Sequence, residues 1–206
     1  MLESSNLRVP VTRDIIVIGA SAGGVEALKA LVSFLPSDLP ASVFAVLHIT
    51  PWADSLLPRI LDHNGRLPAQ HPISGQPILP GNVYVAPPDQ HMLLEKDSIR
   101  LWHGPKENLH RPAINPLFRS AAVHFKQRVI GVILSGTRDD GSAGLWWVKE
   151  FGGLTVVQDP SEAGFSDMPR SAIEHVAVDH VLDLAGIGTL LTELAVDAEP
   201  KKRRIK

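Results

Sequence analysis

Three side chains that together could hydrolyse an ester lie far apart in this sequence of 206 residues. Ser21 could supply a hydroxyl nucleophile, and His48 could be the base that activates it. Either Asp139 or Asp140 could orient the imidazole, and spacing alone does not choose between them. Each of these groups follows a short apolar run that is typical of a buried strand. Because ligands bind beyond the carboxyl ends of parallel strands, we expect the three groups to meet at one edge of a sheet.

The loop that carries Ser21 suits a nucleophile but also fits a structural role. Ser21 lies among the small residues of 19–24, directly before an expected helix. Small neighbours allow a sharp turn, and the free N–H groups at the helix N-terminus would stabilise an oxyanion beside the hydroxyl. The alternative is that Ser21 only caps this helix, which is a common role for serine.

The same loop partly matches two known motifs. Gly19, Ser21 and Gly23 fit the Gly-x-Ser-x-Gly elbow of α/β-hydrolases. We reject that family because its chain order is serine, acid, histidine, whereas here histidine comes second. Gly19, Ser21 and Gly24 also fit the dinucleotide fingerprint Gly-x-Gly-x-x-Gly, with serine in place of the middle glycine. His48 stands where that fingerprint needs an acid, so a nucleotide site is the weaker interpretation.

The composition is that of a globular chain with one domain and a sizeable core. Hydrophobic residues make up 44% and charged residues 20% of the sequence. There is no cysteine, which excludes disulfides, thiolate metal sites and a cysteine nucleophile. No histidine pattern matches a metal signature, so we expect neither a metal nor another cofactor. The lack of cysteine and of long apolar runs favours a cytoplasmic protein without membrane insertion.

Charge is uneven only at the C-terminus. The tail 201–206 holds five of the 20 basic residues, so 15 remain against 22 acidic residues in the whole chain. A body with that balance is not expected to bind nucleic acid. We expect the tail to be a solvated terminus, and contact with an anionic partner is the alternative.

Strands alternating with helices predict one doubly wound α/β domain, with a mainly parallel sheet flanked by helices. A β-hairpin insertion is expected over 91–95 and 98–102. The other strands are expected at 14–18, 42–49, 82–86, 129–134, 154–158 and 176–184. The helices are expected at 25–34, 112–126, 142–151, 169–175 and 187–196.

Several collinear blocks of the sequence resemble the catalytic domain of CheB-type protein-glutamate methylesterases. The resemblance extends from about residue 14 to residue 184, which is nearly the whole chain. The matching blocks are 18–24, 46–49, 85–92, 110–122, 134–136, 140–141, 158–159 and 168–170.

The resemblance implies a parallel α/β domain that hydrolyses glutamate methyl esters on the cytoplasmic helices of chemoreceptors, in bacterial chemotaxis adaptation. Methanol is released, and some members also deamidate receptor glutamines. The resemblance assigns Ser21 as nucleophile and His48 as general base. It selects Asp140 as the orienting acid, and the backbone N–H groups of Ala22 and Thr137 as oxyanion donors.

Three arginines of the matching blocks are expected to contact acidic receptor surface, namely Arg111, Arg119 and Arg170. The alternative is that they hold local carboxylates.

The sequence departs from the family pattern beside the expected triad. Ala22 replaces a threonine, and Thr137 and Arg138 replace Met-Gly. Arg138 stands where glycine would tolerate a positive φ. Thr137 and Arg138 therefore support an alternative, a non-catalytic or differently specific CheB-like module that binds a signalling partner.

Typical family members begin with a phosphoacceptor receiver domain, for which the segment before residue 14 is too short. We expect an N-terminal extension over 1–13, a methylesterase catalytic domain over 14–196 and a basic tail over 197–206. Without a receiver domain, the protein is expected to be either constitutively open or regulated by a partner in trans.

Overall fold

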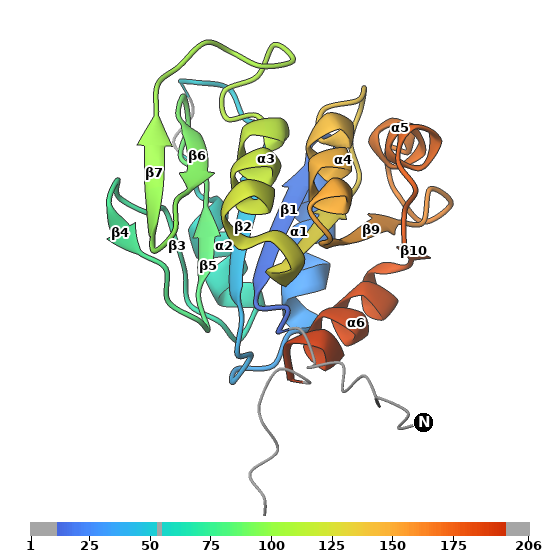
Figure 1. Cartoon of the computed structure of the whole chain (residues 1–206), viewed down its shortest axis with the longest axis horizontal. Helices are drawn as coiled ribbons and strands as arrows, with labels where there is room; N and C mark the ends of the chain where they lie inside the picture. Colours follow the sequence, from blue (N-terminus) through green and yellow to red (C-terminus); the bar gives the residue numbers. More distant parts are fainter. Residues whose placement is uncertain (1–11, 53–54, 197–206) are drawn as a thin grey trace, which may run out of the picture.

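Seven parallel strands form the central sheet of the computed structural model, which describes residues 12–52 and 55–196. The expected basic tail and residues 1–11 of the expected extension lie outside the described residues. The strand order is β10-β9-β8-β1-β2-β5-β3 (Figure 1). The strands are β1 Ile15–Ala20, β2 Ser42–Leu47, β3 Ala69–Gln70, β5 Val83–Val85, β8 Val129–Ile133, β9 Leu154–Gln158 and β10 His180–Leu182.

The chain reverses its direction of winding beside β1. From β1 it proceeds to β2 and the strands beyond, then returns to β8 on the other side of β1 and continues to β9 and β10. Ligands of doubly wound sheets bind at such a switch point, outside the carboxyl ends of the strands. The predicted fold class, a doubly wound and mainly parallel sheet flanked by helices, is confirmed.

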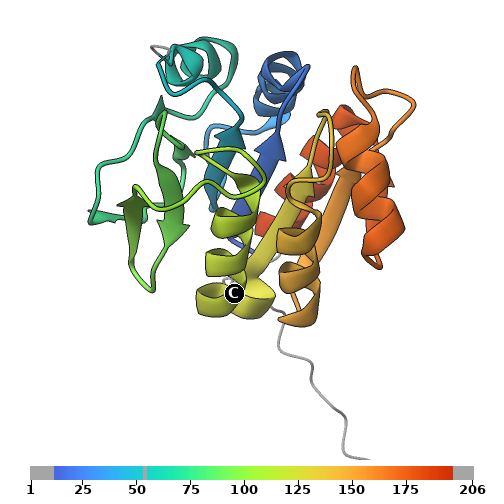
Figure 2. The same ribbon diagram turned by 90° about the horizontal axis from the view of Figure 1, so that it is seen from above.

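Helices cover both faces of the sheet (Figure 2). One face is covered by α1 Gly24–Phe34, α2 Leu57–Asn64 and α6 Leu184–Val196, and the other by α3 Ile114–Phe125, α4 Ser142–Glu150 and α5 Asp167–His175. The face with α3, α4 and α5 also carries a small antiparallel sheet. A 3₁₀ turn, Lys126–Arg128, connects α3 to β8.

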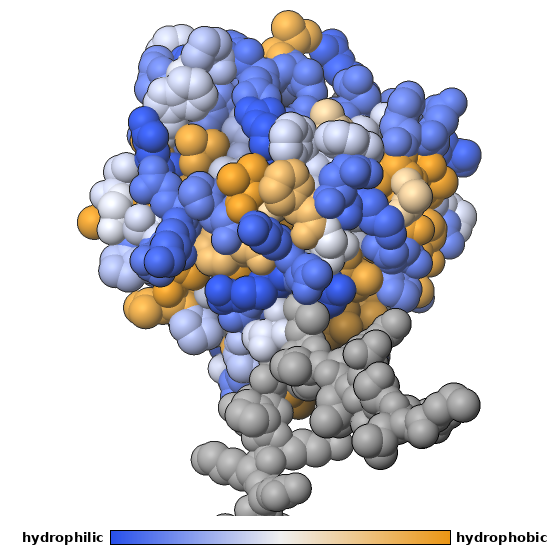
Figure 3. Space-filling model, viewed as in Figure 1, coloured by the Kyte–Doolittle hydropathy of each residue, from blue (hydrophilic) through white to orange (hydrophobic). Residues whose placement is uncertain are grey.

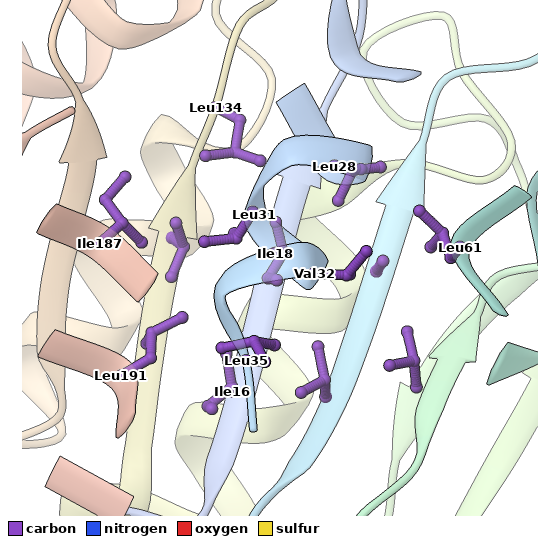
Figure 4. Packing of buried hydrophobic residues seen from close by; sticks show 14 of the residues in the cluster. Ile16, Ile18, Leu28, Leu31, Val32, Leu35, Leu61, Leu134, Ile187 and Leu191 are labelled. Atoms are coloured by element: carbon purple, nitrogen blue, oxygen red, sulfur yellow. The ribbon is translucent and has the colours of Figure 1, made fainter. Parts of the chain in front are cut away.

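Alternate residues of β1 belong to the two hydrophobic clusters, one on each face of the sheet. Every residue of β1 is buried, because helices cover both faces of the strand. Ile16 and Ile18 face α1, where Leu28 and Leu31 pack against them (Figure 4). Ile15 and Val17 point to the opposite cluster, with residues of α3 and α4. The β-branched run therefore places β1 at the centre of the molecule.

The hairpin predicted from the sequence is confirmed and gains a third strand. β6 His91–Leu94 pairs antiparallel with β7 Ser98–Trp102, and β7 pairs with β4 Gln76–Pro77. Met92 and Leu94 pack in the same cluster as the apolar face of α3. This small sheet thus fixes where the loop between β7 and α3 starts.

Several expected boundaries were wrong. The helices expected from residues 169 and 187 begin earlier, at Asp167 of α5 and Leu184 of α6. α3 begins at Ile114, two residues later than Pro112, which precedes the helix N-cap Ala113. The strand expected over 176–184 is reduced to β10 at the sheet edge, where only three residues pair with β9. Val176 is buried for a different reason, since it packs with α5 and the core rather than in the ladder. Helix α2 was not predicted, because it is short and contains a proline.

The outer surface over α3 and α4 mixes polar and apolar side chains rather than gathering the apolar ones in one patch (Figure 3). None of the helices in the described part of the chain is both long enough and apolar enough to cross a bilayer.

Candidate active site

Parallel register brings Ser21 and His48 side by side. Ala20 of β1 is paired with Leu47 of β2, and both strands end at this point. The His48 N–H donates to the Ala20 carbonyl at 3.2 Å, which continues the ladder by one step. The residues that follow the two strands must therefore be neighbours, although 27 positions separate them in sequence.

A tight turn exposes the Ser21 hydroxyl. The turn ends in Gly23, whose φ of 71° is favourable only for glycine, and α1 starts at the next residue. Gly23 is the N-cap of α1, and no side-chain hydrogen bond caps this helix. The Ser21 hydroxyl lies 3.1 Å from His48 Nδ1 instead. The alternative that Ser21 only caps the helix is therefore wrong.

The imidazole of His48 connects the hydroxyl to a carboxylate. His48 Nε2 lies 2.8 Å from Asp140 Oδ2. Because an ionised carboxylate can only accept, Nε2 carries the proton and the lone pair of Nδ1 faces Ser21. In the serine-protease template the nucleophile pairs with Nε2, so the two ring nitrogens exchange roles here.

Asp140 is buried, with 2% of its surface exposed, and four groups donate to its carboxylate. Besides His48, these are the N–H of Ile114 at 2.7 Å, the N–H of Asn115 at 3.4 Å and the amide of Asn108 at 3.0 Å. Burial acts to raise the pKa of Asp140, but the hydrogen bonds from His48 and Ile114 outweigh it and keep the pKa below 3.8. The carboxylate is therefore ionised at neutral pH.

Asp139, the other acid that the sequence allowed, is exposed, and its carbonyl accepts from the Ser142 N–H at 3.1 Å. The structure thus brings Asp140 rather than Asp139 to His48.

Two helices fix the position of Asp140 by exchanging caps. Neither α3 nor α4 is capped by the side chain of its own N-cap residue. Asp140, which precedes α4, accepts from the first two N–H groups of α3. Asn115 of α3 in turn caps α4. Its Oδ1 accepts hydrogen bonds from the backbone N–H of Gly141 at 3.1 Å and of Gly144 at 2.7 Å. These bonds satisfy donors that helix N-termini leave free.

The loop after β8 touches the nucleophile through Gly136. A Cβ added to Gly136 would lie 2.9 Å from the Cβ of Ser21 and 2.1 Å from Sδ of Met168, so only glycine fits. Ser135 ties the two loops together, because its Oγ donates to the Ala22 carbonyl at 2.8 Å. Its own carbonyl accepts from the Ser21 N–H at 3.0 Å.

The expected oxyanion donors flank this contact. Within the described residues, the N–H groups of Ala22 and Thr137 donate to no protein group. Their role as oxyanion donors stays a prediction.

A cleft of about 330 Å³ opens over the hydroxyl and the imidazole. Lys106 and Arg111 make its wall cationic. It is lined by Ser21, His48, Ile49, Thr50, Pro51, Lys106, Leu109, His110 and Arg111.

The three expected receptor-binding arginines are placed differently. Arg111 lines the cleft while its Nε donates to Asp89 at 2.8 Å. Arg119 is outside the cleft lining and holds Glu107 with two hydrogen bonds, at 2.8 and 3.3 Å. Arg170 is exposed on α5, where its Nε donates to Ser166 at 3.2 Å. Their contact with a receptor stays a prediction.

The sequence did not point to Asn108 or Lys106 as residues of the site. His110 belongs to a block that carried the family resemblance, but nothing in that block indicated that its ring lies against His48. In the described part of the chain, no three acidic or histidine side chains are grouped so as to hold a metal ion.

Comparison with known proteins gives consistent matches over most of the chain. A family model described as CheB methylesterase matches residues 16–191. A putative protein-glutamate methylesterase/protein-glutamine glutaminase of Leptospira interrogans is 42% identical over 182 residues, which cover 88% of this chain and 94% of the relative. A protein-glutamate methylesterase/protein-glutamine glutaminase of Anaeromyxobacter dehalogenans is 38% identical over 88% of this chain and 53% of its own length. The crystal structure of the Thermotoga maritima CheB methylesterase catalytic domain superposes with a TM-score of 0.84 and 34% identity, covering 89% of this chain and all of that domain.

The cap exchange can be tested by removing Asn115. Asn115→Ala leaves two N–H groups of the α4 N-terminus without an acceptor, so we expect a loss of about 2–4 kcal/mol in the free energy of unfolding. Urea denaturation measures the change. Asn64→Ala, at an exposed position in α2, is the matched control and should cost less than about 1 kcal/mol. Equal stability of the two variants would contradict the role of Asn115.

Arg138 offers a test of local strain. Its φ is 68°, a left-handed conformation that costs an L-residue about 1–2 kcal/mol. Since glycine adopts this conformation freely but loses more entropy on folding, we expect Arg138→Gly to raise the free energy of unfolding by about 0.5–1 kcal/mol. Thermal unfolding of Arg138→Gly and the parent measures this change in stability. Arg170→Gly, in α5, should destabilise instead, and a lower melting temperature for Arg138→Gly would refute the assignment of strain.

Proposed function

The chain belongs to the CheB methylesterase family, and on that premise we propose that it is a serine hydrolase that demethylates chemoreceptor glutamates. Its substrates are glutamate γ-methyl esters on the cytoplasmic helices of chemoreceptors, and its products are methanol and glutamate. It acts in the cytoplasm during chemotaxis adaptation. The names of the relatives also support hydrolysis of receptor glutamines, with ammonia as the product.

One observation carries the proposal, namely the continuous hydrogen-bonded relay from Ser21 through His48 to Asp140. The three residues follow β1, β2 and β8, which are adjacent in the sheet. The hydroxyl opens into a cleft, whereas the carboxylate is buried, so substrate can reach only one end of the relay.

The mechanism follows from the positions of the protons. Ser21 Oγ attacks the ester carbonyl while His48 Nδ1 takes the hydroxyl proton, and Asp140 stabilises the imidazolium. The tetrahedral oxyanion collapses, His48 returns the proton to the leaving methoxide, and methanol departs. Water then attacks the acyl-enzyme with His48 again as base, which frees glutamate and restores Ser21.

The oxyanion would be stabilised by the N–H groups of Ala22 and Thr137. The departures from the family pattern at Ala22 and Thr137 change only side chains, so a backbone N–H donor remains at both positions.

The charge of the cleft supports an acidic protein substrate. Lys106 lies on the rim, and no hydrogen bond or ion pair holds its ammonium among the described residues. Arg111 already pairs with Asp89, so Lys106 is the better placed of the two to meet a receptor carboxylate.

Methanol release from receptor-bearing membranes tests the function directly. Ser21→Ala should lower the rate at least about 10³-fold, because among the described residues only the Ser21 hydroxyl is hydrogen-bonded to the His48 imidazole. Ser33→Ala, at an exposed position in α1, is the control and should retain the parental rate. Methanol release by Ser21→Ala at the parental rate would refute the mechanism.

The non-catalytic alternative gives a different result. A serine-directed phosphonate should label the parent at Ser21, and a module that only binds a partner should remain unlabelled under the same conditions.

A further inference from the structure

The loop between β7 and α3 runs over the carboxyl ends of the strands and reaches the relay (Figure 1). Two consecutive residues of this loop, Asn108 and Leu109, have φ values of 48° and 71°. Neither is glycine, so the left-handed conformation costs free energy at both positions. Such strain persists only where surrounding contacts impose it.

The strained pair directs two side chains onto the relay. Asn108 donates its amide to Asp140 Oδ1 at 3.0 Å, so it holds the oxygen that His48 does not use. His110 stacks on His48, with ring centroids 3.6 Å apart and an interplanar angle of 4°. Leu109, between them, is exposed and lines the cleft.

Two arginines, Arg119 and Arg111, anchor the loop between β7 and α3. Glu107 and His110 exchange backbone hydrogen bonds of 3.2 and 2.9 Å, which close the turn. Arg119 holds Glu107 from α3. Arg111 anchors the start of the loop, because its guanidinium donates to the Gly104 carbonyl as well as to Asp89.

We propose that Asn108 and His110 are positioning residues that hold the carboxylate and the imidazole of the relay in line with Ser21. The proposal rests on the proposed function for its substrate but not for its geometry. Neither residue needs to touch the reacting atoms.

Stacking restricts a tilt of the His48 ring that its two hydrogen bonds still allow. The His48 ring can still tilt about the line that joins its two hydrogen-bonded nitrogens. A parallel ring at van der Waals distance blocks that tilt on one side and keeps water from the same face. Misplacement of a reacting group by about 1 Å can cost about 100-fold in rate, so a modest tilt would be costly.

His110 must be neutral to serve in this way. Burial lowers its pKa, and the nearby His48, Arg138 and Lys106 lower it further, while Asp140 acts in the opposite direction. A neutral ring offers its π face to the imidazolium that forms during hydrolysis, whereas a charged ring would repel it.

The kinetic test compares His110→Ala, His110→Phe and Asn108→Ala with the parent. We expect both alanine variants to lose about 10- to 100-fold in kcat with little change in KM. Phenylalanine keeps a flat ring over His48, so His110→Phe should stay within about threefold of the parent. His124→Ala, at an exposed position in α3, is the matched control and should leave kcat unchanged.

Two readouts separate positioning from a merely structural role. The rate of Ser21 phosphonylation should fall in both alanine variants as kcat does, and this readout needs no receptor. Two-bond ¹H–¹⁵N NMR couplings should assign the proton to His48 Nε2 in the parent and His110→Phe, and a mixture of tautomers in His110→Ala. An effect confined to KM, or unchanged couplings in His110→Ala, would overturn the proposal.

The same experiment distinguishes the two proposals. Methanol release by the parent with undiminished phosphonylation of both alanine variants overturns the positioning role and leaves the proposed function intact. Slower phosphonylation in the variants of a parent that releases no methanol supports positioning and overturns the substrate assignment.

Stability provides an independent check through pH. Because the pKa of His110 in the fold lies below its ordinary value of 6.5, the unfolded chain binds this proton first as pH falls. The parent should therefore lose stability as pH falls below about 6.5, until His110 also protonates in the fold. His110→Phe should lose less stability between pH 7 and pH 5 in urea denaturation, and an equal loss would count against a neutral His110.

Discussion

The buried carboxylate of Asp140 is the interaction on which the site depends. An isolated buried charge is costly, so the fold must surround it with donors. It receives one from His48, one from Asn108 and two from the α3 N-terminus, and the helix dipole adds to their effect. The donors that stabilise the carboxylate also fix its orientation. The His48 ring therefore has one orientation in which its Nε2–H points at Asp140 Oδ2. Stability of the helix pair and alignment of the relay thus have the same cause.

Parallel pairing supplies the other constraint. β1, β2 and β8 are hydrogen-bonded neighbours, so the residues after them must emerge close together at one edge. Small residues then bring the loops into contact, since Gly136 touches Ser21 where no side chain would fit. The rest of the sheet, with cores on both faces, keeps these three strand ends rigid. A preorganised site of this kind needs little rearrangement when charge develops on a substrate.

Backbone strain is concentrated around the cleft. Of the five non-glycine residues with positive φ in the described part of the chain, four belong to loops at this edge, namely Asp89, Asn108, Leu109 and Arg138. The family resemblance implies a glycine at the position of Arg138, and Arg138 adopts the left-handed conformation all the same. The departure from the family pattern therefore changes the charge and the stability of the loop more than its path. The hydrogen-bonded relay from Ser21 through His48 to Asp140 is intact beside this strained residue.

The sequence by itself determined most of the strands, most of the helices and three candidate groups, because apolar periodicity and turn residues act over short distances. It also placed Ser21 and His48 at strand ends, from which their proximity followed. It could not choose between Asp139 and Asp140 from spacing, since one residue of rotation decides which carboxylate turns inward to the N-terminus of α3. It gave no sign that Asn108 would bond Asp140, that Asn115 of α3 would bond the N-terminus of α4, or that His110 would stack on His48. Those contacts join segments about 25 to 60 positions apart, and only the packing of α3 against α4 and of the β7–α3 loop over the sheet edge brings them together.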